Sequence, residues 1–443
     1  MPIGARSIQV RNLIALMASL QVLWLITRWF LGDIPTSRQL PAYIVYTVFF
    51  GVVIGHMPTG FVSRIRRLRE GLVRNEKLLI LTLSAIVLSV GFLYISYHHI
   101  GYDDSCFAAS RIVAVEGLRS LFADYVHLPW LGRQHPPLAP VVYGFAMRVL
   151  GVNLLVTRLT CLMFGIGTIL ATYFLGRELL DRTTGLLAAF LLLSTRDFLR
   201  FATGVALIDM PMAFFFALSM LLTLRMFRKP TYWLSVAVGI SIGAGLLSKY
   251  TMLLIYPALL CYFIVNRQFR RFIPHLGLVV LVSVCIVAPW LLYAYRNEIF
   301  DTHTGSVISY SRTLISSTFI KKTYFGIKLM FETLLARLPS SLGIYSLPLL
   351  VLGGLHLLRR RGPSDLFLLI WIAPAFLLLT LTLPVPRYFF PIFPALTIVM
   401  ACWLRHHSKV VEQVILLALL YCGETLYLYT DIKGGIRLLV DFG

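Results

Sequence analysis

The chain has 443 residues, 58% of them hydrophobic and only 13% charged, and its formal net charge is +21. A soluble protein typically has about 25% charged residues, so this sequence lacks the polar surface that a water-exposed globule needs. The composition therefore predicts an all-α polytopic membrane protein. The basic residues lie mainly in short clusters between apolar stretches, where anionic headgroups attract them. This placement, on a chain without a sizeable polar domain, excludes nucleic acid as a partner.

Apolar stretches long enough to cross a bilayer predict about thirteen transmembrane helices. The segment 137–150 is too short and begins with prolines, so we expect a re-entrant or juxtamembrane helix there. The predicted spans, in chain order, are 12–31, 41–62, 78–97, 154–175, 183–199, 211–227, 232–248, 250–266, 275–295, 340–358, 365–383, 388–404 and 410–430.

The lysine and arginine residues of the short loops predict the orientation of the chain. Placing the basic loops, of which 64–77 is the strongest, in the cytoplasm makes the spans alternate consistently. The N-terminus is then inside, the C-terminus outside, and the polar chemistry faces outward from the plasma (inner) membrane. The predicted units are a two-span extension with the basic segment, a transmembrane module with an outer loop at 98–136, and a last span with a tail: 1–77, 78–404 and 405–443.

The six cysteines are scattered singly along the chain, and none forms a CxxC pair. This pattern predicts neither a disulfide framework nor a zinc site. We interpret the cysteines as small apolar packing residues.

An acidic pair follows the span 78–97 in the sequence GYDDSCFAASRIV. Asp103 or Asp104 could accept a proton from an attacking hydroxyl at the membrane surface. The alternative is structural, because carboxylates also stabilise the positive N-terminus of the helix that follows, with Ser105 as its expected N-cap.

Two further candidates lie in the outward-facing segments. His135 precedes two prolines, which impose an extended, rigid approach, and it could bind a phosphate or a sugar hydroxyl. An ordinary surface histidine is the alternative. Asp209 lies just before a span, either as a second carboxylate of the same outward cavity or as a helix cap.

Cations near the membrane boundary form the last group of candidates. Lys249 is a single cation between two apolar spans, where a phosphate is a natural counter-ion and snorkelling to headgroups is the alternative. Arg387, next to Tyr388, can bind phosphate bidentately, whereas anchoring in the aromatic belt is the competing role. Arg158 lies within a predicted span, which snorkelling from near the span's end would explain.

The order and spacing of these motifs resemble the protein O-mannosyltransferase and aminoarabinose-transferase superfamily, the type C glycosyltransferases. The resemblance covers roughly 78–404 and rests on the acidic pair, the HPPL turn and four longer stretches. Those stretches are VTRLTCLMFGIGTILATYFLGREL, LLAAFLLLSTRDFLRFATGVALIDMPMAFFFALSM, GAGLLSKYTMLLIYPALL and RYFFPIFPAL.

The resemblance implies an inverting transfer of a sugar from a polyprenyl-phosphate carrier to a hydroxyl of a protein, lipid or glycan. It implies Asp103 as general base, Asp209 as a second carboxylate, and Lys249 and Arg387 as ligands of the donor phosphate, with Arg158 assisting. Such a transfer is metal-independent or weakly assisted by a divalent cation. The acidic pair is Asp-Asp here where Asp-Glu is common in the superfamily, and the turn is HPP where many relatives have KPP.

Two other functions remain as alternatives. A transporter or flippase of lipid-linked glycans would use the same ionisable residues as a pathway, but it predicts related halves and polar residues at mid-span, which the sequence lacks. A non-catalytic membrane scaffold gives no reason for an outward cluster of ionisable residues.

Overall fold

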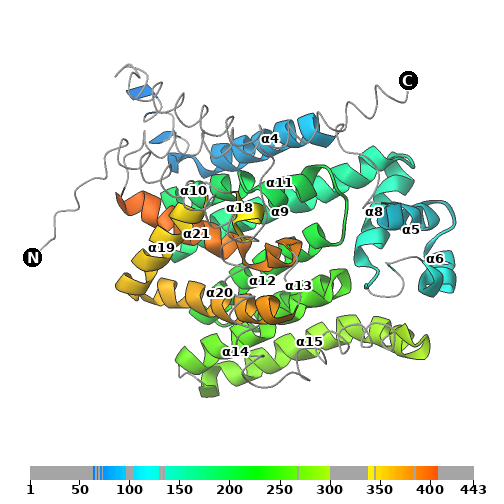
Figure 1. The fold of residues 1–443 in the computed structure, drawn as a ribbon. Helices are drawn as coiled ribbons and strands as arrows, with labels where there is room; N and C mark the ends of the chain where they lie inside the picture. Colours follow the sequence, from blue (N-terminus) through cyan, green and yellow to red (C-terminus); the bar gives the residue numbers. More distant parts are fainter. Residues whose placement is uncertain are drawn as a thin grey trace, which may run out of the picture.

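The computed structural model describes residues 76–95, 104–128, 131, 135–266, 269–299, 338–343, 346–382 and 386–407, together with isolated positions between 63 and 75. These residues form helices and no strands (Figure 1). In chain order the elements are α4 (Glu76–Ile95), α5 (Asp104–Val115), α6 (Leu118–Asp124), the 3-10 helix η1 (Tyr125–His127), α8 (Leu138–Leu150), α9 (Leu154–Leu179), α10 (Arg182–Leu193), α11 (Arg196–Thr203), α12 (Asp209–Arg228), α13 (Tyr232–Ser248), η2 (Tyr250–Leu254), α14 (Ile255–Asn266), α15 (Phe269–Arg296), α18 (Leu338–Leu342), α19 (Ser346–Arg360), α20 (Pro363–Thr382), η4 (Pro386–Ile392) and α21 (Phe393–His407).

Most predicted spans in this part of the chain correspond to one helix each, and the segment 137–150 is a 13-residue helix, α8. In 250–266 and 388–404 a 3-10 helix continues directly into α14 and α21, and two other spans are divided by a break. The stretch 183–199 contains the end of α10 and the start of α11, and 340–358 contains α18 and α19. The predicted spans 12–31, 41–62 and 410–430 lie outside the described residues.

Polar side chains fix where several of these helices begin. Asn153 accepts a hydrogen bond from the backbone N–H of Val156 at 2.9 Å, directly before α9. Asp181 and Thr231 do the same at the start of α10 and α13. Each side chain satisfies one of the N–H groups that a helix leaves unpaired at its first turn.

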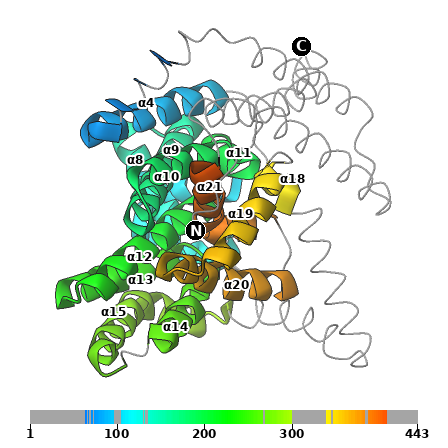
Figure 2. The ribbon, with the colours of Figure 1, turned by 90° about the vertical axis from the view of Figure 1, so that its left-hand side faces the viewer.

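The helices pack into a bundle with α4 at one edge and α14 and α15 at the opposite edge (Figures 1 and 2). Four helices are long and apolar enough to cross a membrane, among the described residues. The share of the 18-residue apolar stretch of each helix that is buried inside the protein rises from 22% in α15 to 89% in the segment that contains α21. α21 is therefore central, whereas α15 exposes apolar side chains such as Val280, Leu281, Val284 and Leu292. Such a face suits lipid, so the chain is a multi-pass membrane protein.

Small residues allow close contacts between helices of the bundle. A Cβ on Gly176 of α9 would lie 2.7 Å from the Cα of Gly185 in α10, and one on Gly185 would clash with the carbonyl oxygen of Tyr173. Close backbone approach through glycine is a common means of helix association in membranes. α9 and α10 therefore form a tight antiparallel pair at the core of the described bundle.

Two adjacent glycines in α19 offer a matched test of this packing. A Cβ at Gly353 would lie 2.7 Å from the carbonyl oxygen of Val399 in α21, whereas nothing lies within 4 Å of a Cβ at Gly354. We expect Gly353→Ala to lower the free energy of unfolding by about 1–3 kcal/mol, the usual cost of overpacking. Gly354→Ala should leave it unchanged or raise it. Thermal unfolding of both variants in detergent would measure the difference, and equal stabilities would contradict the α19–α21 contact.

One end of the bundle collects charged side chains in ion pairs. Arg225 approaches Glu178 to 2.7 Å, and Arg405 approaches Asp181 to 3.6 Å. The basic partners lie in the last turns of α9, α12, α19 and α21, beside loops that the sequence predicted as cytoplasmic. The pairs that the structure describes here are Glu76–Arg177, Glu178–Arg177, Glu178–Arg225, Glu178–Arg228, Asp181–Arg405 and Asp365–Arg360.

Candidate active site

The α12–α13 hairpin brings two predicted site residues together. Asp209 is the first residue of α12, and Lys249 directly follows the last residue of α13. Because the two helices are antiparallel neighbours, the start of one and the end of the other lie at the same end of the bundle. This end is opposite to the one that holds the ion pairs of Arg225 and Arg228.

Asp209 and Lys249 form a buried ion pair. The ammonium of Lys249 donates a hydrogen bond to Oδ1 of Asp209. Asp209 is 0% exposed and Lys249 is 4% exposed. Lys249 therefore does not snorkel to headgroups. Asp209 does not cap α12 either, because Ile208 occupies the cap position and no side chain makes a capping hydrogen bond there.

The 3-10 helix η4 brings two more candidates to this pair. The Lys249 Nζ lies 4.0 Å from the centre of the Tyr388 ring, and the Arg387 guanidinium lies 5.8 Å from the same centre. A cation over a desolvated aromatic face gains about 2 kcal/mol or more. The cluster of Asp209, Lys249, Arg387 and Tyr388, called here the cation cluster, holds one carboxylate and two cations. It therefore carries one positive charge in excess, and an anion could balance it.

Hydrogen-bonding capacity remains within the cation cluster. Oδ2 of Asp209 and Nε of Arg387 are both buried and have no hydrogen-bond partner among the described residues. A buried polar group without a partner costs free energy, and such groups commonly mark sites where a ligand binds. The guanidinium N–H suits a phosphate oxygen.

Aromatic side chains connect His135 to the same end of the bundle. His135 is buried, and its carbonyl oxygen accepts a hydrogen bond of 2.9 Å from the Tyr125 hydroxyl. The Tyr125 ring meets Trp290 of α15 edge to face at 5.3 Å. The Trp290 indole N–H in turn donates to the hydroxyl of Tyr250, which follows Lys249 in the chain. His135 is thus a packed residue and not an ordinary surface histidine.

Helix α8 connects α5 with the start of α12. The hydroxyl of its Tyr143 donates a 2.8 Å hydrogen bond to the carbonyl oxygen of Leu207, two residues before Asp209. α8 also packs closely on α5, because a Cβ on the next residue, Gly144, would lie 2.7 Å from the carbonyl oxygen of Ser110. α5 therefore packs at the same end as the cation cluster.

The acidic pair Asp103–Asp104 stands where α5 begins. Asp103 lies outside the described residues, and Asp104 begins α5 with a side chain that the structure does not describe. Ser105, the expected N-cap, is the second residue of α5 instead. The structure therefore gives no geometry for the acidic carboxylates.

Arg158 is buried in α9, one turn before Cys161. The Cys161 thiol contacts the carbonyl oxygens of Phe201 and Val205, in and just after α11. Arg158 therefore lies inside the bundle, and snorkelling does not explain it.

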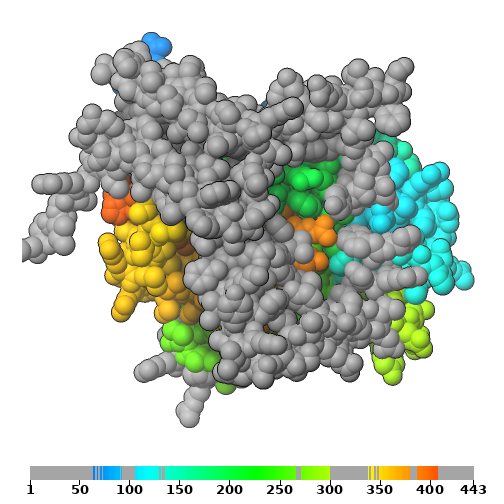
Figure 3. All heavy atoms as spheres, in the orientation of Figure 1, coloured from blue at the N-terminus to red at the C-terminus, as the bar shows by residue number. Residues whose placement is uncertain are grey.

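Figure 3 shows the cyan segments of α5–α8 at one side of the molecule, with green and orange atoms visible beside them.

The sequence did not single out Tyr125, Tyr143, Tyr250 and Trp290. They hold the outer-loop segment against α12 and α15 through hydrogen bonds and ring contacts. In a chain with 21 tyrosines and 7 tryptophans, no local pattern separates these four from aromatics that only pack.

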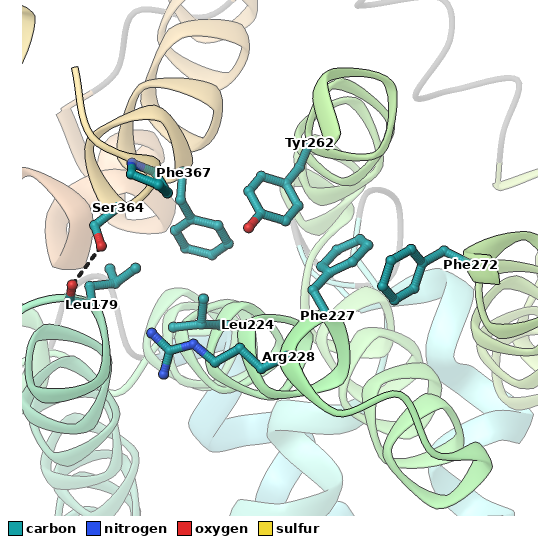
Figure 4. Close-up of a pocket in the computed structure, with 9 residues that line it drawn as sticks. Leu179, Leu224, Phe227, Arg228, Tyr262, Phe272, Ser364 and Phe367 are labelled. Carbon is teal, nitrogen blue, oxygen red and sulfur yellow. Dashed lines mark hydrogen bonds between the residues drawn. The ribbon is translucent and has the colours of Figure 1, made fainter. Parts of the chain in front are cut away.

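A cavity lies at the other end of α12, among residues of five helices (Figure 4). Its volume is about 240 Å³, and the Ser364 hydroxyl donates a 2.5 Å hydrogen bond to the carbonyl oxygen of Leu179 at its edge. Asp209 and Arg228 stand nineteen residues apart, so about 28 Å of helix separates the cavity from the cation cluster. It contains none of the predicted site residues. The cavity is lined by Leu179, Leu224, Phe227, Arg228, Tyr262, Phe272, Pro363, Ser364 and Phe367.

Known proteins resemble this chain in sequence and in fold. Residues 134–293 match the family described as Dolichyl-phosphate-mannose-protein mannosyltransferase. No curated protein matches the sequence. ArnT from Cupriavidus metallidurans, solved in the apo state and bound to undecaprenyl phosphate, is 20% identical with a TM-score of 0.56, and the alignment covers 74% of this chain and 60% of ArnT. An Archaeoglobus fulgidus oligosaccharyltransferase in complex with Zn and sulfate is 16% identical with a TM-score of 0.53, covering 78% of this chain and 52% of that one.

The fold is that of a type C glycosyltransferase, as the sequence predicted. The family match over 134–293 and the similarity of the fold to ArnT agree with the resemblance to the protein O-mannosyltransferase and aminoarabinose-transferase superfamily. The chain spans 60% of ArnT and 52% of the oligosaccharyltransferase.

Proposed function

We propose that this protein transfers a sugar from a polyprenyl-phosphate carrier to a hydroxyl acceptor at the outer face of the plasma membrane. The observation that carries the proposal is the cation cluster, in which a buried Asp209–Lys249 pair lies beside Arg387 and Tyr388. A sugar linked through a phosphodiester carries one negative charge, which balances the one positive charge in excess. The ArnT structure bound to undecaprenyl phosphate supports a lipid phosphate as ligand of this fold.

In the proposed reaction, the acceptor hydroxyl oxygen attacks the anomeric carbon, and the bond from that carbon to the phosphate oxygen breaks. Inversion follows because attack and departure occur on opposite faces. Asp103 takes the hydroxyl proton as general base. Lys249 and Arg387 stabilise the negative charge that develops on the leaving polyprenyl phosphate.

The remaining candidates have positioning roles in this proposal. Asp209 holds Lys249 in place through their ion pair, because a fully buried carboxylate at the lysine ammonium is poorly placed to contact an acceptor. Tyr388 presents its ring to Lys249. His135 and Arg158 complete the polar lining of the same end and contact donor sugar hydroxyls or phosphate.

A single-compartment assay separates transfer from transport. We expect the full-length protein, purified in detergent, to move radiolabelled sugar from a polyprenyl phosphate to an acceptor extract from the cell envelope. Transport needs two compartments, so a flippase would show no turnover in detergent and sugar-lipid movement only in vesicles. That second pattern would refute the proposed function. The Asp103→Asn variant provides the matched negative control.

A further inference from the structure

A cluster of metal-ligating side chains lies at the opposite end of the bundle from the cation cluster. His356 of α19 and Cys402 and His406 of α21 each offer one ligand atom, and these atoms all lie within 4.8 Å of one another. We propose that these three residues form a binding site for a divalent transition-metal ion with affinity for sulfur, such as Zn²⁺, which joins α19 to α21.

The backbone arrangement sets the spacing of the ligands. Gly353 lets α19 approach Val399 of α21 closely, and one turn further along each helix stand His356 and Cys402. His406 follows Cys402 by four residues, so both project from the same face of α21. Ligand atoms around a tetrahedral zinc lie about 3.5 Å apart, so a small inward rotation of the side chains would complete the site.

Hydrogen bonds orient the two imidazoles as a metal ligand requires. Nδ1 of His406 lies 2.8 Å from the carbonyl oxygen of Cys402, to which it donates, and 3.9 Å from the Cys402 Sγ, so Nε2 is the ring nitrogen that keeps its lone pair for a metal. Nδ1 of His356 lies 3.2 Å from Nε2 of His407. Nε2 of His356 is buried and has no hydrogen-bond partner in the described part of the chain. In metal sites, a partner at the second ring nitrogen commonly fixes the ligating histidine in this way.

The surroundings fit a cation despite a nearby arginine. Cys402 is 1% exposed, and Arg360 lies within hydrogen-bonding reach of its thiol. The Arg360 guanidinium is also bound bidentately by Asp365, at 2.7 and 2.5 Å, which offsets its charge. His406 is exposed at the helix end and gives an ion a route of entry and a solvent ligand. Thiolate and imidazole together select zinc over magnesium or calcium.

This site does not take part in the proposed transfer. Tyr388 precedes Cys402 by fourteen residues, a rise of about 21 Å in helical geometry. The ion would instead fix α19 on α21.

Cobalt titration tests the site directly. Full-length protein with an affinity tag free of histidine, in detergent, should bind one equivalent of Co²⁺ with a near-ultraviolet thiolate-to-cobalt absorption band, and Zn²⁺ should displace it. Cys402→Ser should lose the band. Cys285→Ser, at an exposed cysteine of α15, should keep it.

Two histidine variants extend the test without disturbing the core. His406→Ala, at an exposed position, should weaken Co²⁺ binding at least 100-fold, and His407→Ala about 10–100-fold, the usual effect of losing a residue that orients a metal ligand. The proposal is overturned if the unmodified protein shows no band, if the band survives in Cys402→Ser, or if His406→Ala binds Co²⁺ with unchanged affinity. Because neither outcome depends on sugar transfer, the result is independent of the proposed enzymatic activity.

Discussion

Replacing Lys249 by methionine is expected to abolish sugar transfer and to destabilise the protein. The substitution keeps an unbranched side chain, one atom shorter, but leaves the Asp209 carboxylate buried without its ion-pair partner. Removing one member of a buried pair typically costs about 3–5 kcal/mol. Loss of the ammonium also removes a charge-assisted hydrogen bond to the donor phosphate, so transfer should fall at least about 100-fold.

The double variant Asp209→Asn/Lys249→Met separates the two effects. It removes both charges, so most of the lost stability should return in thermal unfolding measured in detergent. Transfer and the affinity for undecaprenyl phosphate should stay low, because no cation replaces Lys249. If the double variant regained transfer together with stability, Lys249 would serve folding alone and the phosphate role would be wrong.

The helices were largely predictable because hydrophobic length and charge placement decide where a chain enters lipid. The span 232–248 matches α13 residue for residue, with Thr231 as its cap. The predicted span 183–199 runs through the break between α10 and α11 because its only charged residues, Arg196 and Asp197, lie near its end. Ser194 and Thr195 end α10 by donating their hydroxyl hydrogens to the carbonyl oxygens of Leu191 and Leu192. Uncharged hydroxyls of this kind look apolar when only charges are counted.

The division of 340–358 has a different cause. Gly343 has a φ of 92°, a left-handed conformation that ends α18 and that glycine adopts without strain. An isolated glycine inside an apolar stretch is common in membrane helices, so the sequence alone does not identify this one as a break.

Part of the candidate site could be predicted from the α12–α13 hairpin. Two antiparallel spans with a basic turn between them place Asp209 and Lys249 at one end, which the sequence showed. Their direct pairing, and the approach of Tyr388 from 139 positions after Lys249, depend on tertiary packing that no local pattern encodes. The burial of Arg158 was likewise not visible, because it depends on which face of α9 meets its neighbours.

The metal cluster shows a related limit. CWLRHH at 402–407 contains a cysteine and a histidine four residues apart, a spacing that suits one helix face. Zinc motifs are recognised by paired ligands close in sequence, and here the third ligand, His356, stands 46 residues earlier on another helix. Only the close contact of α19 with α21 brings the three together.

Asp103→Asn is expected to lower the rate of sugar transfer about 100-fold or more while leaving membrane insertion and donor affinity unchanged. A general base contributes roughly 10²–10⁴-fold, and asparagine has nearly the same shape but cannot take the proton. The residue directly precedes α5, which α8 connects with the start of α12 through Tyr143 and Gly144.

Asp124→Asn is the matched control for that variant, because it removes an exposed carboxylate of the same outer loop, at the end of α6. It should transfer sugar at the normal rate. The transfer rate of Asp104→Asn should lie between those of Asp103→Asn and Asp124→Asn if Asp104 only supports the charge of its neighbour. Single-turnover rates with saturating donor report the chemical step separately from binding. A normal rate for Asp103→Asn, with a slow rate for Asp104→Asn, would transfer the role of base to Asp104, the adjacent carboxylate and first residue of α5.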